Sequence, residues 1–318
     1  MIRLDGSDRD LERAAELLDR GELVAVPTET VYGLAGDAAD PRAVLRIFTA
    51  KGRPPDHPLI VHLPGIEALD DWAAAVPEVA RRLARAFWPG PLTLILPKAG
   101  HVSDVITGYQ RTVGLRVPGH PVTLRLLAIF GRAVAAPSAN RFGRISPTTA
   151  DHVISEFEGR DSVAAVVDGG PCEVGVESTI VDCSGERPRI LRPGMITAGQ
   201  IGQVLGERPA SAGQDEGPRA SGRLPAHYAP ETRVELVDAT ALAAPDPDAA
   251  VLALGVTPDP GGFMAWQSLP EEPAAYARGL YAALRALDTV GARRILVQRP
   301  PGTPAWSAIR DRLDRATA

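Results

Sequence analysis

Polar residues that could bind an anion follow or interrupt several apolar segments of this chain. Residues 27–30, Pro-Thr-Glu-Thr, directly follow the apolar run 23–26 and place two hydroxyls and a carboxylate at its end. A buried strand that opens into such a loop is a common way to build a small-molecule site. Further cations, hydroxyls and an amide stand in or beside other apolar segments: Lys51, Arg53, His62, Arg116, Ser138, Asn140, Ser178 and Arg192. The pattern predicts a site for a polyanion and a small polar molecule.

The clearest anion-binding candidate is Lys51-Gly52-Arg53, which places two cations around a glycine. Such a loop can neutralise phosphate, and a solvated loop is the alternative. The chain has no Walker sequence and no strand–GxGxxG–helix unit. A nucleotide would therefore be held by a different kind of site.

Three other residues leave two explanations open. Arg116 interrupts the alternating segment 113–117, so it must pair with a carboxylate, a ligand or solvent. His62 is alone on its apolar segment, where a core histidine is the usual explanation. Ser138 follows an apolar segment but lies outside a G-x-S-x-G sequence, so a serine hydrolase is not indicated. The scattered histidines do not have zinc-ligand spacing.

Composition limits the class of protein. The chain has 318 residues, is 45% hydrophobic and carries a net charge of −5, which argues against coating nucleic acid through its overall field. Cys172 and Cys183 form no CxxC pattern and are expected to be reduced. Its first residues do not resemble a signal peptide, and no apolar run approaches the ~18 residues of a membrane span. We expect a soluble, cytoplasmic protein with no membrane partner.

The polar residues are positioned by short strands that alternate with helices. Helices are predicted over residues 7–21, 42–49, 77–87, 121–130, 146–157 and 197–205, with Ser146 as an N-cap and Pro147 at the first helical position. Strands are predicted over residues 23–26, 59–63, 92–96, 113–117, 133–136, 163–167, 178–181 and 189–191. The strands are short and bounded by proline, which favours a mixed α/β sheet.

The chain is expected to have three parts. Residues 1–206 form the mixed α/β domain, and residues 207–230 are rich in Ala, Gly, Pro and Ser and are predicted to be a linker or lid. Residues 231–318 form a smaller Rossmann-like α/β domain. Its strands are predicted over 234–237, 251–254 and 295–297, and its helices over 276–287 and 305–316.

Eight segments, taken together, resemble one family. In chain order they are Pro27-Thr28-Glu29-Thr30-Val31-Tyr32-Gly33-Leu34, Lys51-Gly52-Arg53-Pro54, Pro58-Leu59-Ile60-Val61-His62, Trp88-Pro89-Gly90-Pro91-Leu92-Thr93, Arg116-Val117-Pro118, Ala136-Pro137-Ser138-Ala139-Asn140, Gly175-Val176-Glu177-Ser178-Thr179 and Leu191-Arg192-Pro193-Gly194. They resemble the L-threonylcarbamoyladenylate synthases of the YrdC-like fold, over residues 1–200. The tail, with His227-Tyr228-Ala229-Pro230, is similar to the long form of that family.

The resemblance implies a nucleotidyltransferase reaction. L-Threonine, bicarbonate or CO₂, and ATP with Mg²⁺ give threonylcarbamoyl-AMP and pyrophosphate. The product supplies a threonylcarbamoyl group for adenosine next to the anticodon of certain tRNAs, through a separate transferase complex. Direct tRNA binding is left open, and no protein-bound metal is expected beyond the Mg²⁺ carried by ATP.

The resemblance also implies roles for individual residues. Residues around L-threonine would be Thr30, His62, Arg116, Ala136 and Ser178, with Arg116 on its carboxylate. Residues holding ATP would be Lys51, Arg53, His57, Thr112, Ser138, Ser146, Arg192, Tyr228 and Ala229, with Lys51 and Arg53 catalytic. The chain departs from the long form in having Leu224-Pro225-Ala226 where basic residues are usual, and in having His57 where Asn is frequent.

Two other functions fit parts of the pattern. A carbamoyl-adenylating domain of hydrogenase maturation belongs to a much larger chain with acylphosphatase and zinc modules, which this sequence lacks. A YrdC-like protein that binds double-stranded RNA without catalysis is the second alternative, and the negative net charge argues against it.

Overall fold

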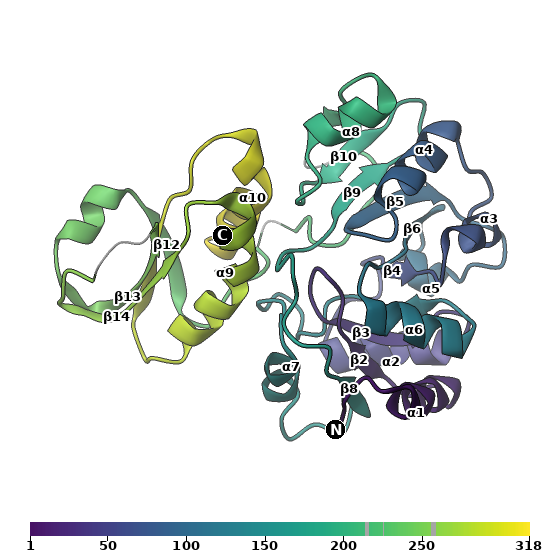
Figure 1. Cartoon of the computed structure of the whole chain (residues 1–318), viewed down its shortest axis with the longest axis horizontal. Coiled ribbons are helices and arrows are strands. Elements are labelled where there is room, and N and C mark those ends of the chain that lie inside the picture. Colours follow the sequence, from purple (N-terminus) through teal and green to yellow (C-terminus); the bar gives the residue numbers. More distant parts are fainter. Residues whose placement is uncertain (214–215, 225, 256–258) are drawn as a thin grey trace.

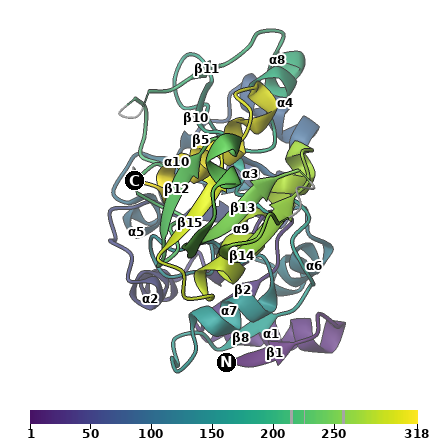
Figure 2. The same ribbon diagram turned by 90° about the vertical axis from the view of Figure 1, so that its left-hand side faces the viewer.

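The computed structural model describes residues 1–213, 216–224, 226–255 and 259–318. They form two α/β units that lie side by side (Figure 1). Figure 2 shows the smaller unit lying across the middle of the larger one. Among the described helices, none is long and apolar enough to cross a bilayer.

The larger unit is built on a mixed sheet with the spatial order β1-β8-β2-β3-β7-β4-β6-β5-β9-β10-β11. Its strands are β1 (Ile2–Leu4), β2 (Val24–Val26), β3 (Gly33–Asp37), β4 (Ile60–His62), β5 (Leu92–Pro97), β6 (Thr112–Arg116), β7 (Val134–Ala135), β8 (Ala165–Val167), β9 (Thr179–Asp182), β10 (Arg189–Arg192) and β11 (Ala210–Ser211). Pairing is parallel between β4 and β6 and antiparallel between β5 and β6, which confirms the predicted mixed sheet.

Most helices of the larger unit begin after a residue whose side chain caps them. The helices are α1 (Asp8–Asp19), α2 (Pro41–Lys51), α3 (Leu69–Trp72), α4 (Glu78–Phe87), α5 (Asp104–Thr107), α6 (Pro121–Phe130), α7 (Ala150–Glu156) and α8 (Ala198–Leu205), and α3 and α4 are the exceptions. Ser7 and Thr197 accept backbone N–H groups of α1 and α8, which satisfies donors that have no partner within the helix. Burial of the apolar face of α1 then holds that helix on the sheet.

The smaller unit has four parallel strands in the order β12-β15-β13-β14. They are β12 (Arg233–Val237), β13 (Asp246–Leu254), β14 (Phe263–Leu269) and β15 (Arg294–Gln298), and the helices are α9 (Pro273–Asp288) and α10 (Ser307–Ala316). Both helices lie on the side of this sheet that faces the larger unit (Figure 1). The second, smaller α/β unit is therefore confirmed.

The two units share one hydrophobic cluster. Val31, Ile145 and Val176 of the larger unit are buried together with Tyr228 and with side chains of α9 such as Leu280. Gly175 allows this contact because it has φ +80°, and a Cβ there would lie 2.4 Å from the carbonyl oxygen of Ala277 in α9. The backbone of α9 therefore packs directly on the loop that leads to Glu177.

The helix start predicted at Ser146 is wrong, and strands β1, β3, β11 and β14 were not predicted. Ser146 and Pro147 do not start a helix: α7 begins at Ala150, and the Thr149 hydroxyl accepts the N–H of His152. The Ser146 hydroxyl is instead buried against Glu177. Strand β3 contains two glycines and few strand-forming residues, so its pairing with β2 and β7 gives no local signal. Strand β14, on the edge of the small sheet, was also not predicted.

Candidate active site

A cavity of about 40 Å³ lies where strand ends of the larger unit meet Ser221, His227 and Tyr228. Its lining residues come from distant parts of the chain: Thr28, Thr30, Val31, Gly33, Ile60, His62, Arg116, Ala136, Pro137, Ser138, Glu177, Ser178, Arg192, Ser221, His227 and Tyr228. We call this the central cavity. Parallel and antiparallel strands end at the same edge here, which is why polar residues far apart in sequence converge.

The central cavity gathers most of the predicted site residues but not all of them. Those that line it are Thr30, His62, Arg116, Ala136, Ser138, Ser178, Arg192 and Tyr228. Those that do not line it are Lys51, Arg53, His57, Thr112, Ser146 and Ala229. The residues of these two groups make different hydrogen bonds.

Thr28 and Thr30 form a hydroxyl pair whose direction can be assigned. The Thr28 hydroxyl donates to the carbonyl of Val31 at 2.6 Å, which uses its single proton. The Thr30 hydroxyl, 2.8 Å from Thr28 Oγ1, must therefore be the donor of that contact. Thr30 is left with acceptor lone pairs, which suit an N–H or O–H group in the cavity.

Arg116 is held by Glu29 at the cavity wall. Its Nη2 donates to Glu29 Oε1 at 2.6 Å and its Nε donates to the Gly90 carbonyl at 3.2 Å. Glu29 also accepts the N–H of Gly119 at 2.8 Å. The ion pair that the sequence left open is therefore present. Within the described residues Arg116 Nη1 has no hydrogen-bond partner, so the guanidinium can still receive a carboxylate.

Lys51, Arg53 and Arg192 form a cluster of buried cations beside the cavity, which we call the cation cluster. Their exposed fractions are 2%, 7% and 2%. Lys51 Nζ donates to the carbonyls of Ser138, at 2.5 Å, and Asn140. Arg53 donates to the carbonyl of Pro58, and Arg192 to those of Ser178 and Ser221. In the described part of the chain, none of the three forms an ion pair with a carboxylate.

Burial lowers the pKa of each cation in the cluster. Burial, followed by repulsion from Arg53, holds the pKa of Lys51 well below its usual value. Burial lowers the pKa of Arg53 to about 10 and also lowers that of Arg192. Buried positive charge without a carboxylate is unfavourable, so this arrangement favours an anionic ligand.

Buried polar atoms without partners mark the same region. Of the seven such side-chain atoms among the described residues, five lie at the cavity or the cation cluster: Arg53 Nε, His62 Nδ1, Asn140 Oδ1, His227 Nδ1 and Tyr228 Oη. Native proteins leave few buried polar groups unpaired. Their concentration here indicates a site that is completed by a polar ligand.

Residues 216–224 dock onto the larger unit beside the cavity. The side-chain amide of Gln110 accepts the N–H of Arg219 at 2.6 Å and donates to the carbonyl of Arg219 at 3.0 Å. Gly222 has φ +76°, and a Cβ there would lie 2.1 Å from the Tyr228 hydroxyl oxygen, so only glycine fits. The Arg223 guanidinium donates hydrogen bonds to the carbonyls of Glu216, Pro218 and Gly213. Pro225, part of the atypical sequence before His227, lies outside the described residues.

Four predicted ATP residues occupy other surroundings. Thr112 lies near Gln110 and Ala220 in a separate small hollow. His57 packs against Phe142, with ring centres 5.3 Å apart, and burial lowers its pKa. Ser146 donates to Glu177 Oε1 at 2.6 Å, and the N–H of Ala229 donates to the Gly143 carbonyl at 3.0 Å.

Sequence reasoning missed three residues that shape the site: Glu29, Glu177 and Arg312. Glu29 and Glu177 belong to two of the eight family-like segments. They form the ion pairs that the buried side chains of Arg116 and Arg312 require. The buried residues of α10 are Ala308, Ile309, Arg312, Leu313 and Ala316, so an arginine occupies an otherwise apolar helical stripe. That break in pattern is a signal that the sequence contains.

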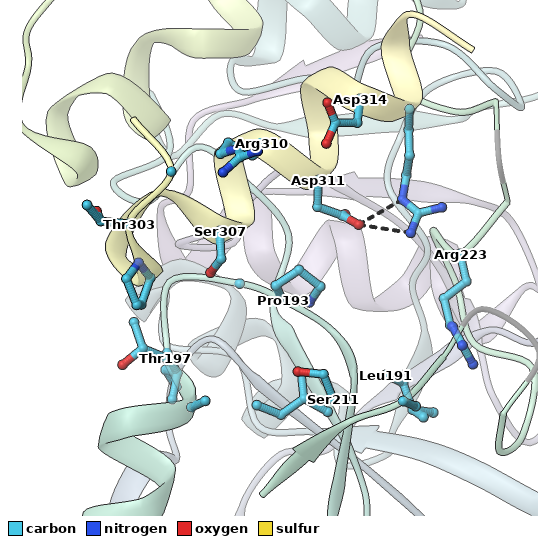
Figure 3. A pocket seen from close by; sticks show the side chains of 18 of the residues that line it. Leu191, Pro193, Thr197, Ser211, Arg223, Thr303, Ser307, Arg310, Asp311 and Asp314 are labelled. Carbon is cyan, nitrogen blue, oxygen red and sulfur yellow. Dashed lines mark hydrogen bonds and ion pairs between the residues drawn. The ribbon is translucent and has the colours of Figure 1, made fainter. Parts of the chain in front are cut away.

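A larger cavity, of about 720 Å³, lies between β10, α8 and α10 (Figure 3). Figure 3 shows Ser307, Arg310, Asp311 and Asp314 of α10 along one wall and Thr197, Ser211 and Leu191 along the other. It is wide and contains both charge signs, but none of the unpartnered buried atoms in the described part of the chain belongs to its lining. We therefore place the candidate active site in the central cavity rather than in the larger one.

Acid should destabilise the fold through His62 and His227. Burial, then repulsion from Arg116, lowers the pKa of His62 to about 3, and burial lowers that of His227 to about 3 against the attraction of Glu177. Below pH ~6.5 the unfolded chain binds protons that the folded chain does not, so the free energy of unfolding falls as pH drops toward 3. Each histidine should remove about 2 kcal/mol between pH 7.5 and pH 5.

Urea denaturation at both pH values measures this effect. The His62→Gln/His227→Gln variant should lose less stability on acidification than the unmodified chain, and His101→Gln, at an exposed position, should change nothing. An equal loss in the double variant would contradict the assignment.

Comparison with known proteins finds relatives along the whole chain. The family model described as "Telomere recombination" matches residues 16–194, and the model "Threonylcarbamoyl-AMP synthase, C-terminal domain" matches residues 196–318. A threonylcarbamoyl-AMP synthase of Bacillus subtilis is 38% identical over 98% of this chain and 94% of its own length. One from Pyrococcus abyssi is 47% identical over 71% of this chain and 67% of its own.

A solved structure is similar over almost the entire length. Sua5 of Pyrococcus abyssi, complexed with L-threonine, matches with a TM-score of 0.89 and 36% identity, over 99% of this chain and 96% of that one. The likeness includes both α/β units and their arrangement.

Proposed function

The chain belongs to the threonylcarbamoyl-AMP synthase family, and we propose that it forms threonylcarbamoyl-AMP and pyrophosphate from L-threonine, bicarbonate or CO₂, and ATP. It would thus act as a nucleotidyltransferase. The product would pass to a transferase complex that modifies adenosine next to the anticodon of tRNA. Since ATP and tRNA are cytoplasmic, we expect the protein to act there.

The cation cluster is the main support for this proposal. Lys51, Arg53 and Arg192 are buried without a carboxylate partner, and a triphosphate would supply the missing negative charge. Lys51 uses two of its three protons on the carbonyls of Ser138 and Asn140, so the third remains for a phosphate oxygen. Arg53 Nε has no partner in the described structure and offers a second donor.

The opposite wall of the cavity suits a small amino acid. Arg116 would bind the threonine carboxylate through its Nη1, while Glu29 keeps the guanidinium in place. Thr30 would accept from a polar hydrogen of threonine. His62 is neutral because burial keeps its pKa low, so it adds no repulsion to an ammonium or amine.

The proposed reaction needs positioning rather than a covalent nucleophile. A carbamate oxygen, formed on the threonine nitrogen, attacks the α-phosphorus of ATP, and the bond to the β-phosphate oxygen breaks as pyrophosphate leaves. The cation cluster would neutralise charge on the phosphates as this occurs. Carbamates and mixed anhydrides hydrolyse, so Ser221, His227 and Tyr228 at the cavity would keep water out.

The segment over the cavity must also move. A cavity needs roughly 10–15 Å³ to hold one water molecule, so the central cavity, at about 40 Å³, holds a few waters at most. L-Threonine and ATP are far larger. Ser221, His227 and Tyr228 would therefore withdraw to admit the substrates and return over them.

Magnesium would enter with ATP. Among the described residues no group of three or more His, Cys, Asp or Glu side chains could hold a metal ion. Glu177, at the cavity wall, is already bonded to Ser146, Tyr281 and Arg312. The residues present do not form a metal cage, and the roles given above to this chain's residues do not depend on one.

The proposed reaction is tested by omitting each substrate in turn. Purified protein should release pyrophosphate from ATP only when L-threonine, bicarbonate and Mg²⁺ are all present, because the carbamate is the attacking group. D-Threonine is the matched control, since its carboxylate and side chain cannot both occupy the same positions. Equal release without threonine would show an ATP hydrolase and reject the proposal.

Binding of double-stranded RNA without catalysis is disfavoured by the same geometry. The cations of the cluster are at most 7% exposed, so they do not present a basic surface to a duplex.

A further inference from the structure

Arg312 is among the largest fully buried side chains in the described structure, and it comes from the smaller unit. It lies on α10 and reaches the loop that forms one wall of the central cavity. Its Nε donates to Glu177 Oε2 at 2.7 Å, and its Nη1 donates to the Pro193 carbonyl at 3.1 Å and to Asp311 Oδ2 at 2.6 Å. One guanidinium therefore joins two wall segments that are 16 residues apart in sequence.

The first of these segments carries Glu177 and Ser178. Burial alone would raise the pKa of Glu177, but Arg312 and then Arg192 outweigh it and bring the pKa to about 2. Glu177 is thus ionised and also accepts from Ser146 and from Tyr281 of α9, at 2.6 and 3.0 Å. Ser178, the next residue, faces the cavity and accepts from Arg192 Nη2 at 3.1 Å.

The second segment carries Arg192, whose neighbour Pro193 is the acceptor for Arg312. The third contact is with Tyr228, because the guanidinium carbon of Arg312 lies 5.1 Å from the centre of that ring. Tyr228 has φ +64°, a left-handed conformation that costs about 1 kcal/mol for a residue with a Cβ. Packing against Arg312 and Tyr281 holds it there.

Other contacts of α10 also hold the segment around His227. The His227 N–H donates to the Arg315 carbonyl at 3.1 Å, and Arg315 Nη1 donates to the Leu224 carbonyl at 2.5 Å. Asp311, which accepts hydrogen bonds from both Arg312 and Arg315, lines the larger cavity (Figure 3). Helix α10 therefore holds the end of the linker as well as the cavity wall.

We propose that Arg312 is a positioning residue, through which the smaller unit fixes Glu177–Ser178, Arg192–Pro193 and Tyr228 in one arrangement around the substrates. The inference rests on the proposed function. Stability alone would not require this ion pair, because well-packed apolar side chains that replace both partners of a buried pair often cost nothing, whereas removing Arg312 alone leaves Glu177 charged and unpaired. Reaching several acceptors at once requires the planar fork of arginine, which lysine lacks.

Arg312→Met and Arg312→Lys test the proposal, with Arg285→Met as matched control. Arg285, which is half-buried, is another arginine of the smaller unit that pairs across the interface, with Glu156 at 3.0 Å, but neither Arg285 nor Glu156 lines the central cavity. Turnover and KM for L-threonine and ATP are measured where circular dichroism shows all variants folded. Both Arg312 variants should lose at least about tenfold in kcat/KM, and Arg285→Met less than about twofold.

Arg312→Lys separates positioning from stability. It keeps a positive charge beside Glu177, so its thermal midpoint should lie nearer that of the unmodified chain than the midpoint of Arg312→Met does. Its kcat/KM should remain low because lysine cannot reach Pro193 and Glu177 together. Unmodified kcat/KM in Arg312→Lys, or equal losses in Arg312→Met and Arg285→Met, would overturn the proposal.

A second measurement does not depend on the proposed reaction. Arg312→Met should be cut by protease within residues 207–230 at least about fivefold faster than the unmodified chain, because Tyr228 and its neighbours are released. Arg285→Met should be cut at the unmodified rate. If the unmodified protein releases no pyrophosphate, the proposed function fails, whereas equal cleavage of both variants rejects the role of Arg312.

Discussion

Replacing Lys51 or Arg53 by methionine should lower kcat by about 10²-fold or more, without loss of stability. Both belong to the cation cluster, and both are buried without a carboxylate. Their charge should be felt mainly as the α-phosphorus is attacked, when negative charge shifts toward pyrophosphate. Methionine fills a similar volume and removes an unpaired buried charge, so the thermal midpoint should be unchanged or higher.

Steady-state pyrophosphate release measures kcat, and thermal melts measure the thermal midpoint. Lys98 is the chain's other lysine and pairs with Asp104 far from the cavity, so Lys98→Met is the control and should keep its turnover. Full activity in the Lys51→Met/Arg53→Met double variant would show that these residues only hold the loop around Ser138.

A fragment that ends at residue 206 should stay folded and bind L-threonine but form at least about 10²-fold less product. Strands β1 to β10 and the helices between them lie inside it, as do Thr30, His62, Arg116 and Ser178. It lacks Ser221, His227 and Tyr228, which line the cavity. It also lacks Arg312, which bonds Glu177 in the cavity wall. Water would then reach the carbamate and the adenylate.

Calorimetric threonine binding shows whether the fragment retains its site, and product is measured as threonylcarbamoyl-AMP. Removing the smaller unit also exposes Val31, Ile145 and Val176, so the fragment should be less stable than the full chain. A fragment that makes the adenylate as fast as the full chain would show that residues 207–230 only tether the two units.

Much of the secondary structure follows from local pattern. Helix α6 covers residues 121–130 as predicted, and α8 follows its Thr197 cap, because periodic burial and capping act within a few residues. Helix α7 shows the limit of such reasoning. Both Ser146 and Thr149 could cap it, and Ser146 fails because its hydroxyl is taken by Glu177, 31 residues later.

The sequence by itself determined which polar groups had to find partners: cations and hydroxyls placed next to buried strands cannot stay unpaired without cost. Only the tertiary structure decided the partners. Arg116 is paired with Glu29, Lys51 with the Ser138 carbonyl and Arg312 with Glu177, across 87, 87 and 135 residues of chain. Such pairs depend on which strand ends and helix faces meet in space and are buried together, and no local pattern encodes that meeting. For this reason the strand-end residues of the site could be predicted, whereas the contribution of α10 could not.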